Sequence, residues 1–247
     1  MGTKDSYTGG GGKAGKDLRD SVLQWADGVA SSGGGPSRPS LAANALLPAL
    51  GLFRASADGP GGGGGPAGGG GGARRTVAAS ARAASRAAAA AWGLRTGNAE
   101  ALRELGLDYD KLRASNDPLQ VIKEIVNAAC GPLADGTIED HEQRYVAAEI
   151  AGWVLEAQAE GSGPTPEEIV RESIALIIFE AACSETAARL KEDDRPAWVG
   201  LAAEEEMMAT ARVLAGNAKL SASGATESEL SQAIEQGIES LRQIWGK

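Results

Sequence analysis

The sequence predicts an all-α protein, in which a helical bundle of about six helices follows a long glycine-rich N-terminal tail that we expect to be largely disordered. Only ten of the 247 residues are aromatic, so the core must be built from Ala, Leu, Ile and Val, whose small side chains suit close helix packing. After residue 73 the apolar residues recur at helical spacing. Most of the 35 glycines precede that point. We therefore divide the chain into a tail, 1–73, and a helical domain, 74–247.

The start of the tail carries no apolar periodicity. Residues 1–16, MGTKDSYTGGGGKAGK, are rich in glycine, whose backbone freedom makes ordering costly without a partner. Residues 17–26 are predicted to form a short helix, because Leu18, Val22 and Trp25 recur at spacings of four and three and so share one face. A helix of that length is not stable unaided.

The second half of the tail contains an apolar segment and a spacer. Residues 41–53, LAANALLPALGLF, cannot form one regular helix because Pro48 and Gly51 interrupt it. We interpret this segment as a docking element. Residues 55–73 are almost entirely Gly, Ala and Pro, and we expect them to behave as a flexible spacer.

Cap signals locate the helices of the domain. Residues 74–95 are dominated by alanine and are predicted to form a long helix ended by Gly97, followed by a short helix over 99–105. Later helices are predicted to start at Asp117-Pro118 with Gln120 as a capping-box partner, at Thr137 with Asp140, at Thr165 with Glu168, after Pro196, and at Thr226 with Glu229.

The apolar positions of four of these helices define their buried faces, and the helix after Thr165, with the widest apolar stripe, is expected to be central. The side chains expected to be buried are Leu119, Ile122, Ile125, Val126 and Ala129 in the first; Val146, Ile150, Trp153, Val154 and Ala157 in the second; Ile169, Val170, Ile174, Ile177, Ile178 and Ala181 in the third; and Leu230, Ile234, Ile238, Leu241 and Trp245 in the last.

Charge is distributed unevenly. Residues 1–97 hold 11 Lys/Arg and 5 Asp/Glu, and residues 98–247 hold 13 and 28, so the halves carry +6 and −15. An acidic domain repels nucleic acid and anionic membranes, so we expect neither as a direct partner. Cys130 and Cys183 lie on apolar helix faces, where free cysteine behaves as a small hydrophobe. With no leader and no long apolar stretch, we expect a cytoplasmic protein.

The motifs that carry chemistry are incomplete. Residues 10–16, GGGKAGK, match a phosphate-binding loop, but Asp17 stands where Ser or Thr should hold magnesium, and no strand precedes the loop. His141 is the sole histidine, which excludes sites that need two. Arg75, Arg82 and Arg86 define a basic stripe without an aromatic residue to stack a base, so they are expected to pair with the acidic domain. We expect no enzyme, metal site or cofactor.

The N-terminus is the remaining chemical feature. Removal of Met1 would expose the amine of Gly2, whose pKa of about 8 leaves a neutral fraction at pH 7 that lysine lacks. A terminal glycine has no side chain and can enter a narrow active-site tunnel of another protein. The opening also fits the myristoylation pattern, with Ser6 at the required position, so a lipid anchor on Gly2 stays open as an alternative.

The order of these segments resembles a known family. The opening MGTKDSYTGGGG, the apolar LLPALGLF, the Ala/Arg helix and the stretch DGTIEDHEQR over 135–144 together look like the QatB component of the Qat antiphage defence system. The resemblance implies a partner enzyme similar to 7-cyano-7-deazaguanine synthase (a QueC-like, QatC-like enzyme) that modifies Gly2 with a deazaguanine-type group using ATP. Zinc and ATP would belong to that partner, and the ATPase of the system is a possible second partner.

The resemblance also implies which residues the partner would recognise, namely Thr3, Lys4, Asp5, Ser6 and Tyr7. Our leading hypothesis is that the tail, helped by contacts of Leu18, Val22 and Trp25 with the partner, delivers Gly2 to the active site of that enzyme. The alternative is a non-catalytic structural adaptor that binds its partner through the apolar segment 41–53 and the helical body.

Overall fold

The described residues form helices and connecting turns without a strand, which confirms the all-α class. The computed structural model describes residues 12–33, 38–53, 75–131, 136–157, 163–192, 195–221 and 224–245. The elements are α1 (Lys13–Ser31), the 3₁₀ turns η1 (Ala43–Ala45) and η2 (Leu47–Leu52), α2 (Val77–Thr96), α3 (Ala99–Glu104), α4 (Tyr109–Ala114), α5 (Pro118–Cys130), α6 (Ile138–Glu156), α7 (Pro166–Glu192), α8 (Ala197–Gly216) and α9 (Glu227–Trp245).

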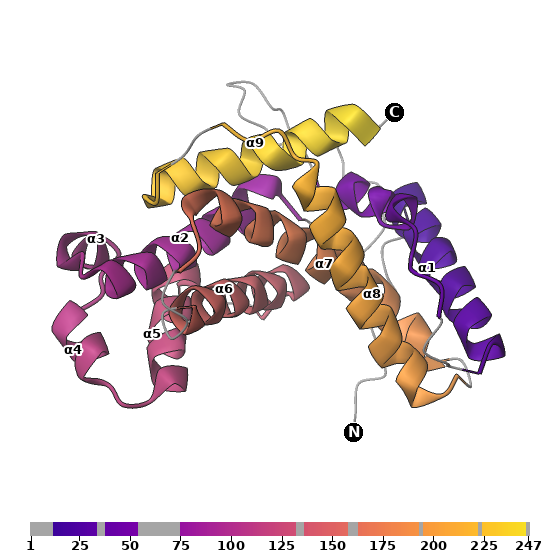
Figure 1. Ribbon diagram of the computed structural model, residues 1–247, viewed down its shortest axis with the longest axis horizontal. Coiled ribbons are helices and arrows are strands. Elements are labelled where there is room, and N and C mark those ends of the chain that lie inside the picture. The colour runs from indigo at the N-terminus through magenta and orange to yellow at the C-terminus, as the bar shows by residue number, and fades with distance from the viewer. Residues whose placement is uncertain are drawn as a thin grey trace.

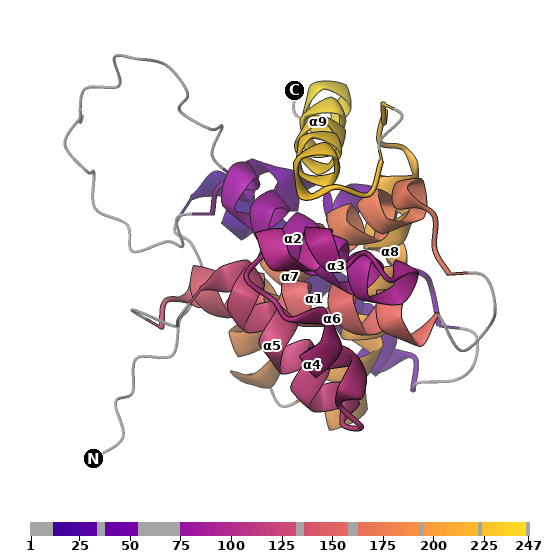
Figure 2. The ribbon, with the colours of Figure 1, turned by 90° about the vertical axis from the view of Figure 1, so that its left-hand side faces the viewer.

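Helix α7 lies at the centre of the molecule, as the sequence predicts. Helices α1, α2, α6, α8 and α9 all pack against it (Figure 1). On one side of α7, helices α2, α5 and α6 pack on one another, with the short α3 and α4 at their end (Figure 2). On the other side lie α8 and α1, while α9 crosses over α2 and α7. The wide apolar stripe of α7 is therefore covered on most sides, and all six side chains predicted to be buried there are buried.

Alanine lets the neighbours of α2 approach closely. The side chains of Ala81, Ala84, Ala87, Ala88 and Ala91 are fully buried where α2 packs against α5, α6 and α9. The helix begins at Val77, three residues later than predicted, because the Thr76 side chain accepts a hydrogen bond from the amide of Ala79 (3.2 Å) and caps the start. Gly97, with φ of 78°, ends it as expected.

The cap signals locate the later helix starts correctly. Thr137 and Asp140 form a reciprocal capping box, as do Thr165 with Glu168 and Thr226 with Glu229. Asp117 accepts hydrogen bonds from the amides of Leu119 and Gln120. The Gln120 side chain, however, donates to Glu124 (3.0 Å) and does not complete the box.

Several details differ from the sequence-based expectation. The described part of residues 74–247 holds eight α-helices, more than the expected total of about six. Seven of them correspond to predicted segments, and α4 was not predicted. Leu119, expected to be buried, is 76 % exposed, and Val121 is buried in its place. The prediction that Trp245 is buried is also wrong. This residue lies at the end of α9 and is 47 % exposed.

The segments before residue 54 differ most from the expectation. Helix α1 spans 19 residues instead of the ten predicted. It packs on α7, α8 and η2, and the turns η1 and η2 pack on α1, α7, α8 and α9. The described parts 12–33 and 38–53 therefore belong to the folded body, because their apolar faces are buried in the same core. Residues 1–11 and 54–74 lie outside the described residues.

Candidate functional site at the start of helix α1

Helix α1 is held on the body by a fully buried apolar face. Leu18, Val22, Ala26 and Val29 recur every three or four residues and have no exposed surface. η2 also approaches closely, since a Cβ placed on Gly51 would lie 3.0 Å from the Cβ of Ala14. The point at which the chain of residues 1–11 joins the folded body is therefore defined by packing.

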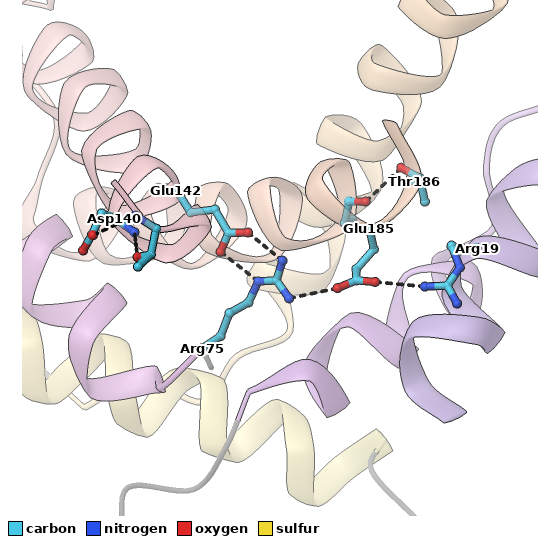
Figure 3. A network of polar contacts seen from close by, with 8 residues as sticks. Arg19, Arg75, Asp140, Glu142, Glu185 and Thr186 are labelled. Atoms are coloured by element: carbon cyan, nitrogen blue, oxygen red, sulfur yellow. Dashed lines mark hydrogen bonds and ion pairs between the residues drawn. The ribbon is translucent and has the colours of Figure 1, made fainter. Parts of the chain in front are cut away.

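A chain of ion pairs reinforces this attachment. The Arg75 guanidinium binds the carboxylate of Glu142 on α6 through two hydrogen bonds, Nε–Oε2 at 2.8 Å and Nη2–Oε1 at 2.6 Å (Figure 3). Its Nη1 binds Glu185 Oε1 on α7 at 3.0 Å. The second oxygen of Glu185 accepts a hydrogen bond from Arg19 Nη1 on α1, also at 3.0 Å. Arg75, Glu142 and Glu185 are buried.

The network keeps its charges. Burial by itself lowers the pKa of Arg75, but the hydrogen bonds and negative charges of Glu142 and Glu185 outweigh that effect and hold its pKa above the usual value. The guanidinium thus stays charged, and two carboxylates share its hydrogen bonds. As a result, residues from α1, α6, α7 and the start of α2 meet at one buried point.

A groove opens at the start of α1, with a volume of about 580 Å³. We call it the α1–α9 groove. Its walls are the first turn of α1, the η1–η2 segment and the end of α9, and the lining residues are Lys13, Ala14, Asp17, Asn44, Leu47, Pro48, Leu50, Gly51, Glu239, Arg242, Gln243 and Trp245. Charged side chains of both signs therefore surround an apolar surface that includes the exposed Trp245 ring.

The predicted partner-binding residues fall into two groups. Gly2, Thr3, Lys4, Asp5, Ser6 and Tyr7 lie outside the described residues. Leu18 and Val22 are fully buried inside this chain, so they hold α1 in place and offer no surface to a partner in this conformation. Trp25 is half-buried, and its indole N–H donates to the carbonyl of Pro39 (2.8 Å). The prediction that Leu18 and Val22 contact a partner is therefore wrong for this conformation. Residues 1–73 were predicted to form a tail, and the packing of α1 on the body was not expected.

The apolar segment 41–53 also belongs to the body. Leu41, Leu46, Leu50 and Phe53 are buried against the core. The backbone of Leu41 is held at both groups, since its N–H donates to Glu206 (3.0 Å) and its carbonyl accepts from Thr210 (3.0 Å), both on α8. Four of the apolar side chains proposed as an adaptor surface are therefore covered by the protein itself, whereas Leu47 and Pro48 are half-buried and line the α1–α9 groove.

The basic residues of α2 do not form one surface stripe. Arg75 lies before the helix and is buried in the network, Arg86 approaches Glu227 on α9 (3.7 Å), and Arg82 is exposed. Arg75 and Arg86 therefore pair with acidic residues, as expected. His141 is exposed in the first part of α6.

The two thiols are free and half-buried. Burial raises the pKa of Cys130, and burial together with the charges of Glu180 and Glu204 raises that of Cys183. Thiolate is the nucleophilic form, so both positions have the character of packed hydrophobes. In the part of the chain that the structure describes, no group of three or more His, Cys, Asp and Glu side chains is placed to bind a metal ion.

Two further findings bear on function. Among the helices of the described ranges, none combines the length and the apolar character that crossing a membrane requires. Comparison with protein-family models, with curated proteins and with solved structures returns no match for this chain.

Proposed function

We propose that this chain is a non-catalytic partner protein of antiphage defence, which presents the amine of Gly2 to an enzyme similar to 7-cyano-7-deazaguanine synthase. The enzyme attaches a deazaguanine-type group to that amine, so this chain is its substrate. The proposal joins the resemblance to the QatB family with the chemistry of a terminal glycine.

One structural observation supports the proposal most: α1 is anchored at its very start. Gly15 and Leu18 are buried within two turns of the first helical residue, Lys13. Residues 2–11 are consequently attached to a fixed point on a folded body. A substrate tail needs such a base, because it limits the volume that Gly2 can search and keeps the terminus near an enzyme bound to the body.

The chemistry balances with ATP as the co-reactant. The partner would join a deazaguanine carboxylate to the α-phosphate of ATP and release pyrophosphate. The neutral Gly2 amine would attack the activated carbonyl carbon, so that a C–N bond forms, the C–O bond to phosphate breaks, AMP leaves and the amine proton passes to water. A terminal α-amine such as that of Gly2, with a pKa of about 8, has a larger neutral fraction at pH 7 than an ordinary lysine side chain, whose pKa is about 10.4.

Intact mass spectrometry after co-expression with the partner tests the proposal. We expect the N-terminal peptide to gain one deazaguanine unit on Gly2. A Lys4→Arg variant should be modified equally, since the α-amine is the acceptor. Unmodified Gly2 in the presence of the active partner and ATP would contradict the proposal, and a myristoyl mass on Gly2 would instead support the lipid-anchored alternative.

A deletion separates substrate from adaptor. Removing residues 2–11 leaves α1 intact, because the helix starts at Lys13. If the chain is a substrate, protection against phage is lost although the body stays folded. If the chain is an adaptor, protection persists, and the proposed function is wrong.

A further inference from the structure

We propose that the α1–α9 groove is the surface on which the modifying enzyme docks, with Trp245 as the central contact. This inference depends on the proposed function, because the docked partner is the enzyme that acts on Gly2. It adds a site on the folded body, distinct from the residues around Gly2 that enter the active site.

Chain geometry places the enzyme close to this groove. Ten residue steps separate Gly2 from Gly12, and a fully extended chain spans at most about 36 Å over that number. The mouth of the active site must therefore lie within that distance of the start of α1. Lys13 and Ala14, the first residues of α1, are themselves part of the groove wall. An enzyme that receives Gly2 can therefore contact this face of the body while it holds the terminus.

The groove offers the kind of residue that dominates protein interfaces. Along α9, the side chains of Leu230, Ile234, Ile238 and Leu241 continue one apolar face and are fully buried. Trp245 is next on the same face, yet 47 % of it is exposed, and its neighbour Ile244 is 42 % exposed. Tryptophan at the centre of an interface is among the most frequent hot spots, because its large ring buries much area at little entropic cost.

The rim of the groove has the composition of an interface rim. Lys13 and Asp17 stand on the α1 side, and Glu239 and Arg242 stand on the α9 side, where they form an ion pair with each other (3.2 Å). An apolar centre within a rim of mixed charge fits an apolar projection of a protein surface. A volume of about 580 Å³ holds a few side chains. The occupant that fits is therefore a loop or helix end of the enzyme beside its active-site opening.

Exposed apolar residues elsewhere supply matched controls. Leu201 on α8 is 65 % exposed, but it does not line the groove. Trp245→Ala and Leu201→Ala both remove one exposed apolar side chain. Neither side chain is part of the core, so both variants should fold, and thermal unfolding followed by circular dichroism checks this.

The test measures affinity and modification of the full-length chain with the synthase-like enzyme. We expect Trp245→Ala to weaken binding, measured by calorimetry, by at least tenfold, which is the order expected for a hot spot. It should lower the rate of Gly2 modification at limiting concentration in proportion, whereas Leu201→Ala should match the wild type. Equal affinity of Trp245→Ala and the wild type would overturn the docking site. So would a change of oligomeric state alone, because the groove would then bind a second copy of this chain.

The two proposals fail in different ways. If the wild-type chain is never modified at Gly2, the proposed function is wrong. If the wild type is modified and Trp245→Ala is modified at the same rate at limiting concentration, the docking inference is wrong and the proposed function stands.

Discussion

Arg75 and Glu142 form a two-point ion pair inside the protein, with hydrogen bonds of 2.6 and 2.8 Å. The two residues are 67 positions apart, and Arg75 is the first described residue after residue 53. The pair therefore ties the beginning of α2 to α6. Glu185 extends it to Arg19, so the same cluster also secures α1. Arg75 binds both carboxylates, so its loss leaves the buried Glu142 without its cation.

Replacing Arg75 by Met should destabilise the protein strongly. The change leaves the carboxylate of Glu142 buried without its cation and removes one of the cations that bind Glu185. Breaking a buried pair in this way typically costs about 3–5 kcal/mol. Urea unfolding measures the effect as a lower midpoint. Arg82→Met is the matched control, because Arg82 is exposed on α2, and it should change stability by less than about 0.5 kcal/mol. Similar midpoints for the two variants would show that the buried network contributes nothing.

Replacing Arg19 by Met should loosen α1 more than the rest of the body. Arg19 binds Glu185 from α1, and Glu185 keeps its ion pair with Arg75 when Arg19 is removed, so the body should lose less stability than in Arg75→Met. We expect amide exchange to accelerate several-fold across residues 18–29, with little change in α2 and α6. Native-state exchange followed by mass spectrometry resolves these segments. If α1 keeps its protection, the apolar face of Leu18 and Val22 is sufficient to hold the helix.

Local chemistry was sufficient to predict where the helices start. It was not sufficient to predict which apolar side chains near the helix ends are exposed. Thr137 with Asp140 satisfies the first amides of a helix with neighbours only three residues apart, so sequence spacing is enough to locate α6. Leu119 is the first member of its apolar series and Trp245 the last member of its own, and both lie at helix ends and are exposed. Whether such a position is covered depends on tertiary packing, which periodicity does not contain.

The contacts that build the candidate site were harder to predict from the sequence than the helix starts. The glycine content before residue 73 favoured a tail, and it concealed that Leu18 and Val22 could be buried against α7, since that contact joins residues more than 140 positions apart. The buried role of Arg75 had no local signal either, because its partners are 67 and 110 residues away. The apolar face shared by Leu18 and Val22 was the available signal, and it was assigned to a partner when it belonged to the core.

Replacing Gly237 by Ala should destabilise the contact between α9 and α7. A Cβ at this position would overlap Ile174 Cδ1 and lie 3.0 Å from Leu220 Cδ2. Ile174 is fully buried and has little room to move, so overpacking should cost about 1–3 kcal/mol in chemical denaturation. Gly200→Ala is the control: nothing lies within 4 Å of a Cβ there, and alanine in a helix should stabilise by about 0.5–1 kcal/mol. Stabilisation by both variants would exclude the close α9–α7 packing.

Carboxylates from two neighbouring helices gather around Glu180 on α7. Burial and the charges of Glu142, Glu149 and Glu204 together raise the pKa of Glu180 to about 7, although the charge of Arg75 lowers it. Glu142 and Glu149 belong to α6 and Glu204 to α8. The ionisation of Glu180 thus adds repulsion where α6 and α8 meet α7, and Glu142 connects this group to the buried ion pairs.

The stability of the protein should therefore fall as pH rises from about 4.5 to about 7, and Glu180→Gln should remove much of that decline. Between the ordinary pKa of 4.5 and the folded value of about 7, the folded chain retains a proton that the unfolded chain has lost. A tenfold change in the proton affinity of a group is worth about 1.4 kcal/mol, so Glu180→Gln should gain up to about 3 kcal/mol at pH 8 and little at pH 4. Urea unfolding across this range measures the slope, with the exposed Glu100→Gln as a control that should follow the wild type. Parallel slopes for Glu180→Gln and the wild type would mean that Glu180 is solvated and that its proton does not control how α6 and α8 pack on α7.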